Sequence, residues 1–200
     1  SMADVEQAAG TDHWASIIRR AKKLDAEAFD VVVDAYGGRL AGFFRRLTGN
    51  GDEADDLVQE VFVRVVRTIG DYQEDGRFEA WLFRIAGNLA RDRLRQRRAR
   101  PGHESLDALR DRGAACEADG RMFPVDRSPA RGIEHDETMD RLQAALLELT
   151  EPERVVILLR HYGQLSFSEI AEYMETPIGT ALARSHRGLE KLRSLMESNQ

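Results

Sequence analysis

Cysteine is nearly absent from this chain, and long apolar runs are missing altogether. Cys116 is the single cysteine among 200 residues, so no internal disulfide can form, which fits a reducing cytoplasm. No apolar stretch approaches the ~18 residues that suggest a membrane span, and no signal peptide is recognisable. We therefore expect a cytoplasmic protein without stable membrane insertion.

Motifs of phosphate-binding and metal-dependent enzymes are missing as well. Neither GxxxxGK nor GxGxxG occurs, and the histidines show no metal-ligand spacing. The histidines are His13, His103, His135, His161 and His186. We predict no metal, no cofactor and no enzymatic activity, so the function must depend on binding.

Long β-branched runs are absent too, and Leu, Ala and Arg dominate, which predicts an all-α fold. Three of the five prolines fall within residues 99–135, together with four glycines and few apolar residues. This composition predicts a flexible linker, with one short helical turn at 106–109 and ends ~35 Å apart on average. We expect two small helical domains, at 14–98 and 136–196, and a disordered N-terminus over 1–13.

Local signals divide the first domain into helices. An amphipathic helix is expected from Trp14, and Asp25 is a suitable N-cap for the next helix. The pair at 37–38 is Gly-Gly and predicts an end or a bend in that helix, and Asn50-Gly51 predicts a turn. Helices are expected over 54–69 and 78–98, with a polar loop at 71–77 between them.

Charge is segregated along the chain although the net charge is only −6. Residues 52–60 contain five acids and no base, whereas residues 77–100 contain eight arginines against Glu79 and Asp92. Such asymmetry suggests two partners of opposite character, one basic and one a nucleic acid.

The acidic segment has one polar face. Asp56, Gln59, Glu60 and Val63 fall at helical spacing opposite an apolar face that begins at Leu57. A solvated helix surface would explain this pattern. A docking surface for a basic partner explains in addition why no Lys or Arg interrupts the segment.

The arginine-rich segment combines aromatic residues with positive charge. Its arginines encircle the end of the predicted helix, which favours phosphate contacts over a salt-bridged surface. Trp81 beside Asn88 suits a single strand, whose unstacked bases are held by π-faces and polar groups. For Trp81 the alternative is simple core packing, and for the arginines it is a solvated surface.

Residues 165–193 have the pattern of a helix-turn-helix. Ser166 and Glu169 have capping-box spacing, and Thr176 followed by Pro177 is a suitable start for the second helix. Arg184, Arg187, Lys191 and Arg193 make this second helix basic. A short helix, a turn and a basic helix are typical of major-groove recognition. An ordinary helical hairpin with a solvated basic face is the alternative.

Three motifs together resemble the extracytoplasmic function (ECF) sigma factors of bacterial RNA polymerase, members of the sigma-70 family. The motifs run in order over about 25–98 and 137–195. They are DDLVQEVF at 55–62, FEAWLFRIAGN at 78–88, and LTEPER at 149–154 leading to SFSEIA at 166–171.

This resemblance implies roles for both domains. The first would dock on the β′ coiled coil of core polymerase and hold the unpaired −10 strand of promoter DNA. The second would read the −35 duplex and meet the β flap, and an anti-sigma factor is a further expected partner. The implied polymerase-binding residues are Asp55, Asp56, Gln59, Glu60 and Val63. The implied −10 residues are Arg77, Trp81, Arg84, Asn88, Arg91, Arg95, Arg97 and Arg98. The implied −35 residues are Ser166, Thr180, Arg184, His186, Arg187 and Lys191.

One departure concerns the predicted recognition helix. Where the family usually has Lys or Arg followed by Ser, this chain has Leu182 and Ala183. Leucine cannot donate to a base or phosphate, although it can touch a thymine methyl; it could also face a protein partner. A stand-alone helix-turn-helix regulator with an N-terminal sensing or oligomerisation domain, and a protein-binding adaptor, are the alternative functions.

Overall fold

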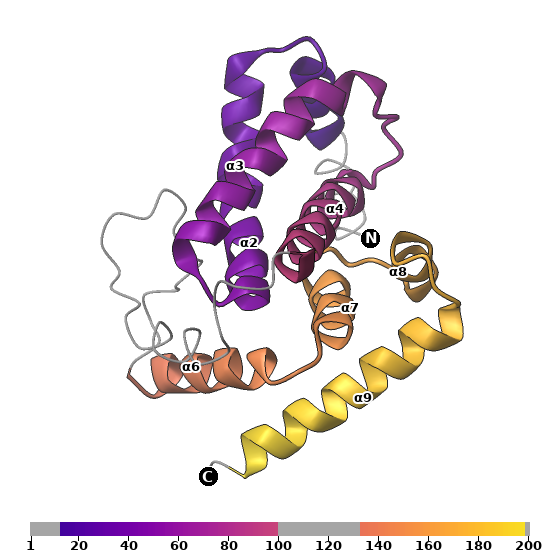
Figure 1. The fold of residues 1–200 in the computed structure, drawn as a ribbon. Helices are drawn as coiled ribbons and strands as arrows, with labels where there is room; N and C mark the ends of the chain where they lie inside the picture. The colour runs from indigo at the N-terminus through magenta and orange to yellow at the C-terminus, as the bar shows by residue number, and fades with distance from the viewer. Residues whose placement is uncertain (1–12, 100–132, 199–200) are drawn as a thin grey trace, which may run out of the picture.

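The computed structural model describes residues 13–99 and 133–198, and the regular elements in these two ranges are all helical (Figure 1). The all-α prediction is therefore confirmed. The expectations for residues 1–12 and 100–132, including the short turn at 106–109, lie outside the described residues. A helix over 13–21 opens the described chain, so residue 13 belongs to a helix and not to a disordered terminus.

Helix α2 (Ala26–Thr48) is capped by Asp25, whose carboxylate accepts a hydrogen bond from the Ala28 N–H. The predicted end of the helix at 37–38 is wrong, because α2 runs through both glycines. Glycine costs a helix interior about 1 kcal/mol relative to alanine. Burial of the following apolar face, which includes Leu40, Phe43 and Phe44, offsets that cost.

Helix α3 (Gly51–Thr68) starts three residues earlier than expected. Gly49 ends α2 in the left-handed region, with φ of 73°, and Asn50 caps α3 by accepting from the Glu53 N–H. The 3₁₀ helix η1 (Ile69–Asp71) follows, and α4 (Phe78–Ala99) begins where predicted. The turn thus lies at 49–50, one residue before the expected one.

The second block contains α6 (Ile133–Leu147), α7 (Glu151–Tyr162), α8 (Phe167–Tyr173) and α9 (Ile178–Glu197). Helix α6 begins three residues before the expected start at 136. The capping box predicted at Ser166 and Glu169 is confirmed at the start of α8, and a second capping box, formed by Thr150 and Glu153, starts α7. Thr176 is not the cap of α9: that position is Pro177, whose carbonyl accepts from the Thr180 and Ala181 N–H groups.

The two blocks pack against each other and share one hydrophobic core. Helix α2 contacts α6 and α7, and α4 contacts α7 and α8. Phe43 of α2 lies edge-on to Phe83 of α4 and to Tyr162 of α7, with ring centroids 5.8 and 6.2 Å apart. Gly163 permits this closeness, because a Cβ there would lie 2.7 Å from the Phe83 Cβ.

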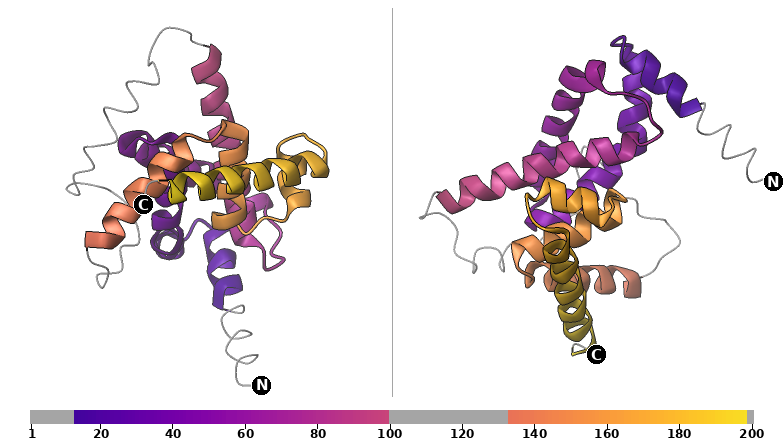
Figure 2. Two further views of the ribbon diagram at one scale, coloured as in Figure 1. Left: turned by 90° about the horizontal axis from the view of Figure 1, so that it is seen from below. Right: turned by 90° about the vertical axis from the view of Figure 1, so that its right-hand side faces the viewer.

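Polar contacts reinforce this shared core. Both Arg39 amino groups donate to the Glu79 carboxylate at 2.6 Å, and one of them also donates to the Tyr162 carbonyl. Figure 2 shows α9 at the outer side of the molecule, away from α3. The predicted domain boundaries stay a prediction. The described residues of the two blocks form one shared core and not two separate ones.

Candidate nucleic-acid and polymerase interface

The acidic helix presents its polar residues to solvent as its periodicity predicted. Asp56, Gln59 and Glu60 are exposed, and so is Val63 at 47%. The opposite face is buried and consists of Leu57, Val58, Val61 and Val65. Asp55 differs from the other four predicted docking residues, because its carboxylate accepts from Arg45 at 3.3 Å within the fold.

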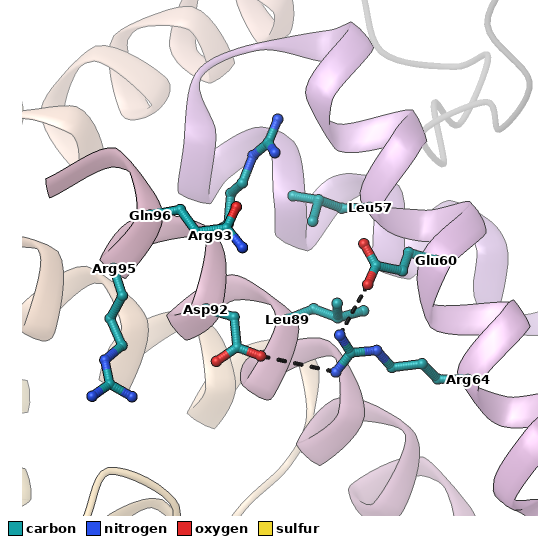
Figure 3. Close-up of a pocket in the computed structure, with 8 residues that line it drawn as sticks. All are labelled: Leu57, Glu60, Arg64, Leu89, Asp92, Arg93, Arg95 and Gln96. Atoms are coloured by element: carbon teal, nitrogen blue, oxygen red, sulfur yellow. Dashed lines mark hydrogen bonds and ion pairs between the residues drawn. The ribbon is translucent and has the colours of Figure 1, made fainter. Parts of the chain in front are cut away.

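An open groove of about 340 Å³ lies between α3 and α4 (Figure 3). Leu57 and Leu89 face each other across it. The Arg64 guanidinium joins its two sides, 2.9 Å from the Glu60 carboxylate and 4.0 Å from that of Asp92. Sequence reasoning missed Arg64, although its spacing of four residues from Glu60 was a usable signal.

Three of the predicted −10 arginines form one row along α4. Arg77, Arg84 and Arg91 are seven residues apart in sequence, so they share a helix face. The structure places each of them against an acid of α8 or of the turn that follows it. The N···O distances are 2.5 Å for Arg77–Glu169, 3.1 Å for Arg84–Glu172 and 3.2 Å for Arg91–Glu175. Sequence reasoning did not foresee these three acids as partners.

Glu169 has two roles in this arrangement. It closes the capping box of α8, accepting from the N–H and the hydroxyl of Ser166, and it also binds Arg77. Burial alone would raise the pKa of the Glu169 carboxyl, but these three donors outweigh burial and hold the pKa below its ordinary value. Glu169 is therefore ionised at neutral pH and ties α8 to the start of α4.

The other predicted −10 residues are in mixed surroundings. Trp81 is half-buried, with its ring 4.9 Å from Tyr72 and 5.4 Å from Phe78, so the core-packing alternative holds for part of its surface. The Asn88 amide oxygen accepts from Arg91 at 3.4 Å. Arg95 is exposed. The side chains of Arg97 and Arg98 lie outside the described residues.

The helix-turn-helix consists of α8, a turn and α9. Several of its predicted −35 residues are engaged within the fold. Arg187 binds Glu153 at 3.4 Å, and Lys191 donates to the Glu148 carbonyl at 2.5 Å. His186 lies 3.4 Å from the Glu190 carboxylate. Ser166 is occupied as the α8 cap, and Thr180 and Arg184 are half-buried.

Apolar side chains stand exposed on the same helix. Leu182 is 45% exposed, and Ile178, one turn earlier, is 51% exposed. Leu182, at the position where the resembled family usually has Lys or Arg, therefore reaches solvent.

Within residues 13–99 and 133–198 no group of three His, Cys, Asp or Glu side chains could hold a metal ion. A helix suited to crossing a bilayer is likewise not found among the described residues.

Comparison with known proteins shows the family of the chain. Residues 32–100 match the family Sigma-70 region 2, and residues 139–192 match Sigma-70 region 4. The chain is 33% identical over 183 residues to the ECF RNA polymerase sigma factor SigW of Bacillus subtilis, covering 88% of this chain and 92% of SigW. This chain belongs to the ECF sigma factors. The family resemblance drawn from the three motifs is thereby confirmed over the stand-alone regulator.

Other relatives agree. The sigma factor is 31% identical to the RNA polymerase sigma-H factor of Pseudomonas aeruginosa and 30% identical to the ECF sigma-E factor of Escherichia coli, in both cases over 88% of this chain and 90% of the relative. It is thus a non-enzymatic initiation factor that directs transcription by RNA polymerase.

Solved structures share the fold. CnrH, in complex with the cytosolic domain of CnrY, superimposes with a TM-score of 0.60 at 24% identity, covering 92% of this chain and 97% of CnrH. The sigma factor RpoE of Bartonella quintana, in complex with the anti-sigma factor NepR, gives 0.59 at 20% identity, covering 86% and 96%.

Proposed function

We propose that this sigma factor divides promoter recognition among three surfaces. The exposed α3 face of Asp56, Gln59, Glu60 and Val63 docks on the β′ coiled coil, with Asp55 supporting it through Arg45. The −10 strand is held by the arginine row of Arg77, Arg84 and Arg91. Trp81, Asn88 and the later arginines, Arg95, Arg97 and Arg98, contribute to the same surface. Helix α9 reads the −35 duplex and the second domain meets the β flap. The observation that carries this proposal is the close placement of an acidic and an arginine-rich helix with opposite charges.

The proposal extends to the location of the factor and to its regulation. The factor works in the cytoplasm, where core polymerase and the promoter are found. An anti-sigma factor restrains it, as supported by two structural relatives: CnrH was solved with the cytosolic domain of CnrY, and RpoE with the anti-sigma factor NepR.

Binding measurements with and without core polymerase test the division of roles. The purified chain should bind a −35/−10 promoter duplex weakly and open no template alone, whereas adding core polymerase should produce a strand-separated complex. Permanganate reactivity of unpaired thymines reports strand separation. A chain that binds duplex tightly without polymerase, and that polymerase does not stimulate, would contradict the proposal.

Leu182 is expected to contact a thymine of the −35 element. Its exposed side chain on α9 can bury the methyl group of a thymine in the major groove. Burying one such group is worth about 0.8 kcal/mol, or roughly fourfold in affinity. We expect holoenzyme to bind a −35 element with deoxyuridine at the contacted thymine about fourfold more weakly, since uracil lacks the methyl. Competition binding across a panel of single thymine-to-deoxyuridine replacements measures the effect.

The matched variant is Leu182→Ala, which should bind thymine and deoxyuridine promoters equally. Ile178→Ala serves as the neighbouring apolar control and locates the contact along α9. If Leu182→Ala keeps the full preference for thymine at every position, Leu182 does not read the methyl.

A further inference from the structure

The described structure is closed at the surface that the proposed function assigns to DNA. The guanidinium groups of Arg77, Arg84 and Arg91 are bound by carboxylates, which present the same charge and the same acceptor oxygens as a phosphate. These acids belong to α8 and its following turn, that is, to the helix-turn-helix domain. A guanidinium edge that holds a carboxylate is not free for a DNA backbone.

Contacts to Tyr173 also hold α8 in register with α4. The Tyr173 hydroxyl donates to the Gly87 carbonyl, and Tyr173 is buried. Gly87 makes this approach possible, because a Cβ there would lie 3.1 Å from Cζ of Tyr173. The Arg91 guanidinium lies over the Tyr173 ring, 5.3 Å from its centre, and donates to the Tyr173 carbonyl at 2.9 Å. The ion pairs are thus part of a packed contact.

The ion pairs of Glu172 and Glu175 are exposed to solvent. The Glu172 and Glu175 side chains are 73% and 82% exposed, and their arginine partners are 42% and 34% exposed. Exposed pairs are weak and are screened by salt. Such ion pairs can hold the two domains together in the free chain. A nucleic acid can still displace the carboxylates, because it places several phosphates against the arginines at once.

We infer that α8 and its following turn act as an internal phosphate mimic, which covers the α4 arginine row and restrains the free sigma factor from binding the −10 strand. This inference rests on the proposed role of α4 in DNA binding. Opening of the α4–α8 contact must precede strand capture. The affinity of the free chain for single-stranded DNA is therefore reduced in proportion to the fraction that is closed.

The test uses the full-length chain and a fluorescein-labelled single-stranded oligodeoxynucleotide, without polymerase. The variant Glu172→Gln/Glu175→Gln removes both exposed charges and keeps side-chain size. It should bind the strand about threefold to tenfold more tightly than the wild type at low salt, as loss of two exposed ion pairs permits. Amide hydrogen exchange should show reduced protection of α8 in the same variant.

The control is Asp30→Asn/Asp34→Asn, which makes the same charge change on an exposed face of α2. It should stay within about twofold of the wild type, because the α4 arginines are paired with Glu169, Glu172 and Glu175 and not with these two residues. Equal strand binding by the two variants, with α8 protection unchanged in both, would overturn the internal mimic.

A second comparison separates this inference from the proposed function. Adding Arg84→Ala to the Glu172→Gln/Glu175→Gln variant should weaken its strand binding. If Arg84→Ala weakens strand binding and Glu172→Gln/Glu175→Gln does not strengthen it, the arginine row binds DNA but is not restrained by α8. Only the present inference then fails. If α8 loses its protection from hydrogen exchange and Arg84→Ala has no effect on strand binding, α4 is not the DNA surface. The proposed role of α4 then fails together with the internal phosphate mimic.

Discussion

Replacing Asp56 by arginine is expected to abolish association with core RNA polymerase and to leave the fold intact. Asp56 is exposed on α3, beside a buried apolar face that the substitution does not touch. Close charge pairs at protein interfaces couple by about 1.5–7 kcal/mol, so a reversed charge should weaken binding at least ~10-fold. Equilibrium binding of the variant to immobilised core polymerase measures this loss.

The matched control for this prediction is Asp30→Arg. It makes the same charge change on the exposed surface of α2, which the proposal does not assign to the polymerase. Helical content and unfolding midpoint should be equal in both variants. Retained co-purification of Asp56→Arg with core polymerase would refute the assigned docking face.

The triple change Arg95→Ala/Arg97→Ala/Arg98→Ala is expected to weaken promoter-complex formation and to flatten its dependence on salt. Each phosphate contact to a single strand contributes about 0.7 to the slope of log K against log salt. Losing three such contacts lowers the slope by about 2, which corresponds to ~100-fold weaker binding near 0.1 M salt. A salt titration of holoenzyme binding to a promoter with a pre-melted −10 region gives both quantities.

Lysine replacement at the same three positions is the control, because it retains the charge and removes the forked guanidinium. The lysine variant should keep the salt slope of the wild type. An unchanged slope in the alanine variant would remove these residues from the phosphate-contacting set.

Local signals in the sequence predicted much of the fold. The capping boxes at Thr150 and Ser166 depend on residues three apart, and both are present. The buried and exposed faces of α3 follow helical periodicity and are also present. Such features are readable because the interacting groups are neighbours along the chain.

Predictions failed where distant packing outweighed a local preference. The glycine pair at 37–38 has a low helix propensity, yet α2 continues through it because its apolar face is buried on both sides of the pair. Thr176 is a good capping residue, but Pro177 takes that position. The preference of glycine against a helix interior is weak, about 1 kcal/mol, and burial of the α2 face exceeded it, whereas the one-residue shift at Thr176 is within the usual variation of a helix start.

Family membership, helical architecture and the separation of acidic from basic helices could all be read from residue order, since each depends on spacing within one helix or motif. The occupation of the α4 arginines could not. It joins residues 84 to 92 positions apart, and their approach depends on how Tyr173 packs against Gly87 and Gly163 against Phe83. No local sequence pattern predicts this α4–α8 contact, because it forms only when two helices from different parts of the chain pack together.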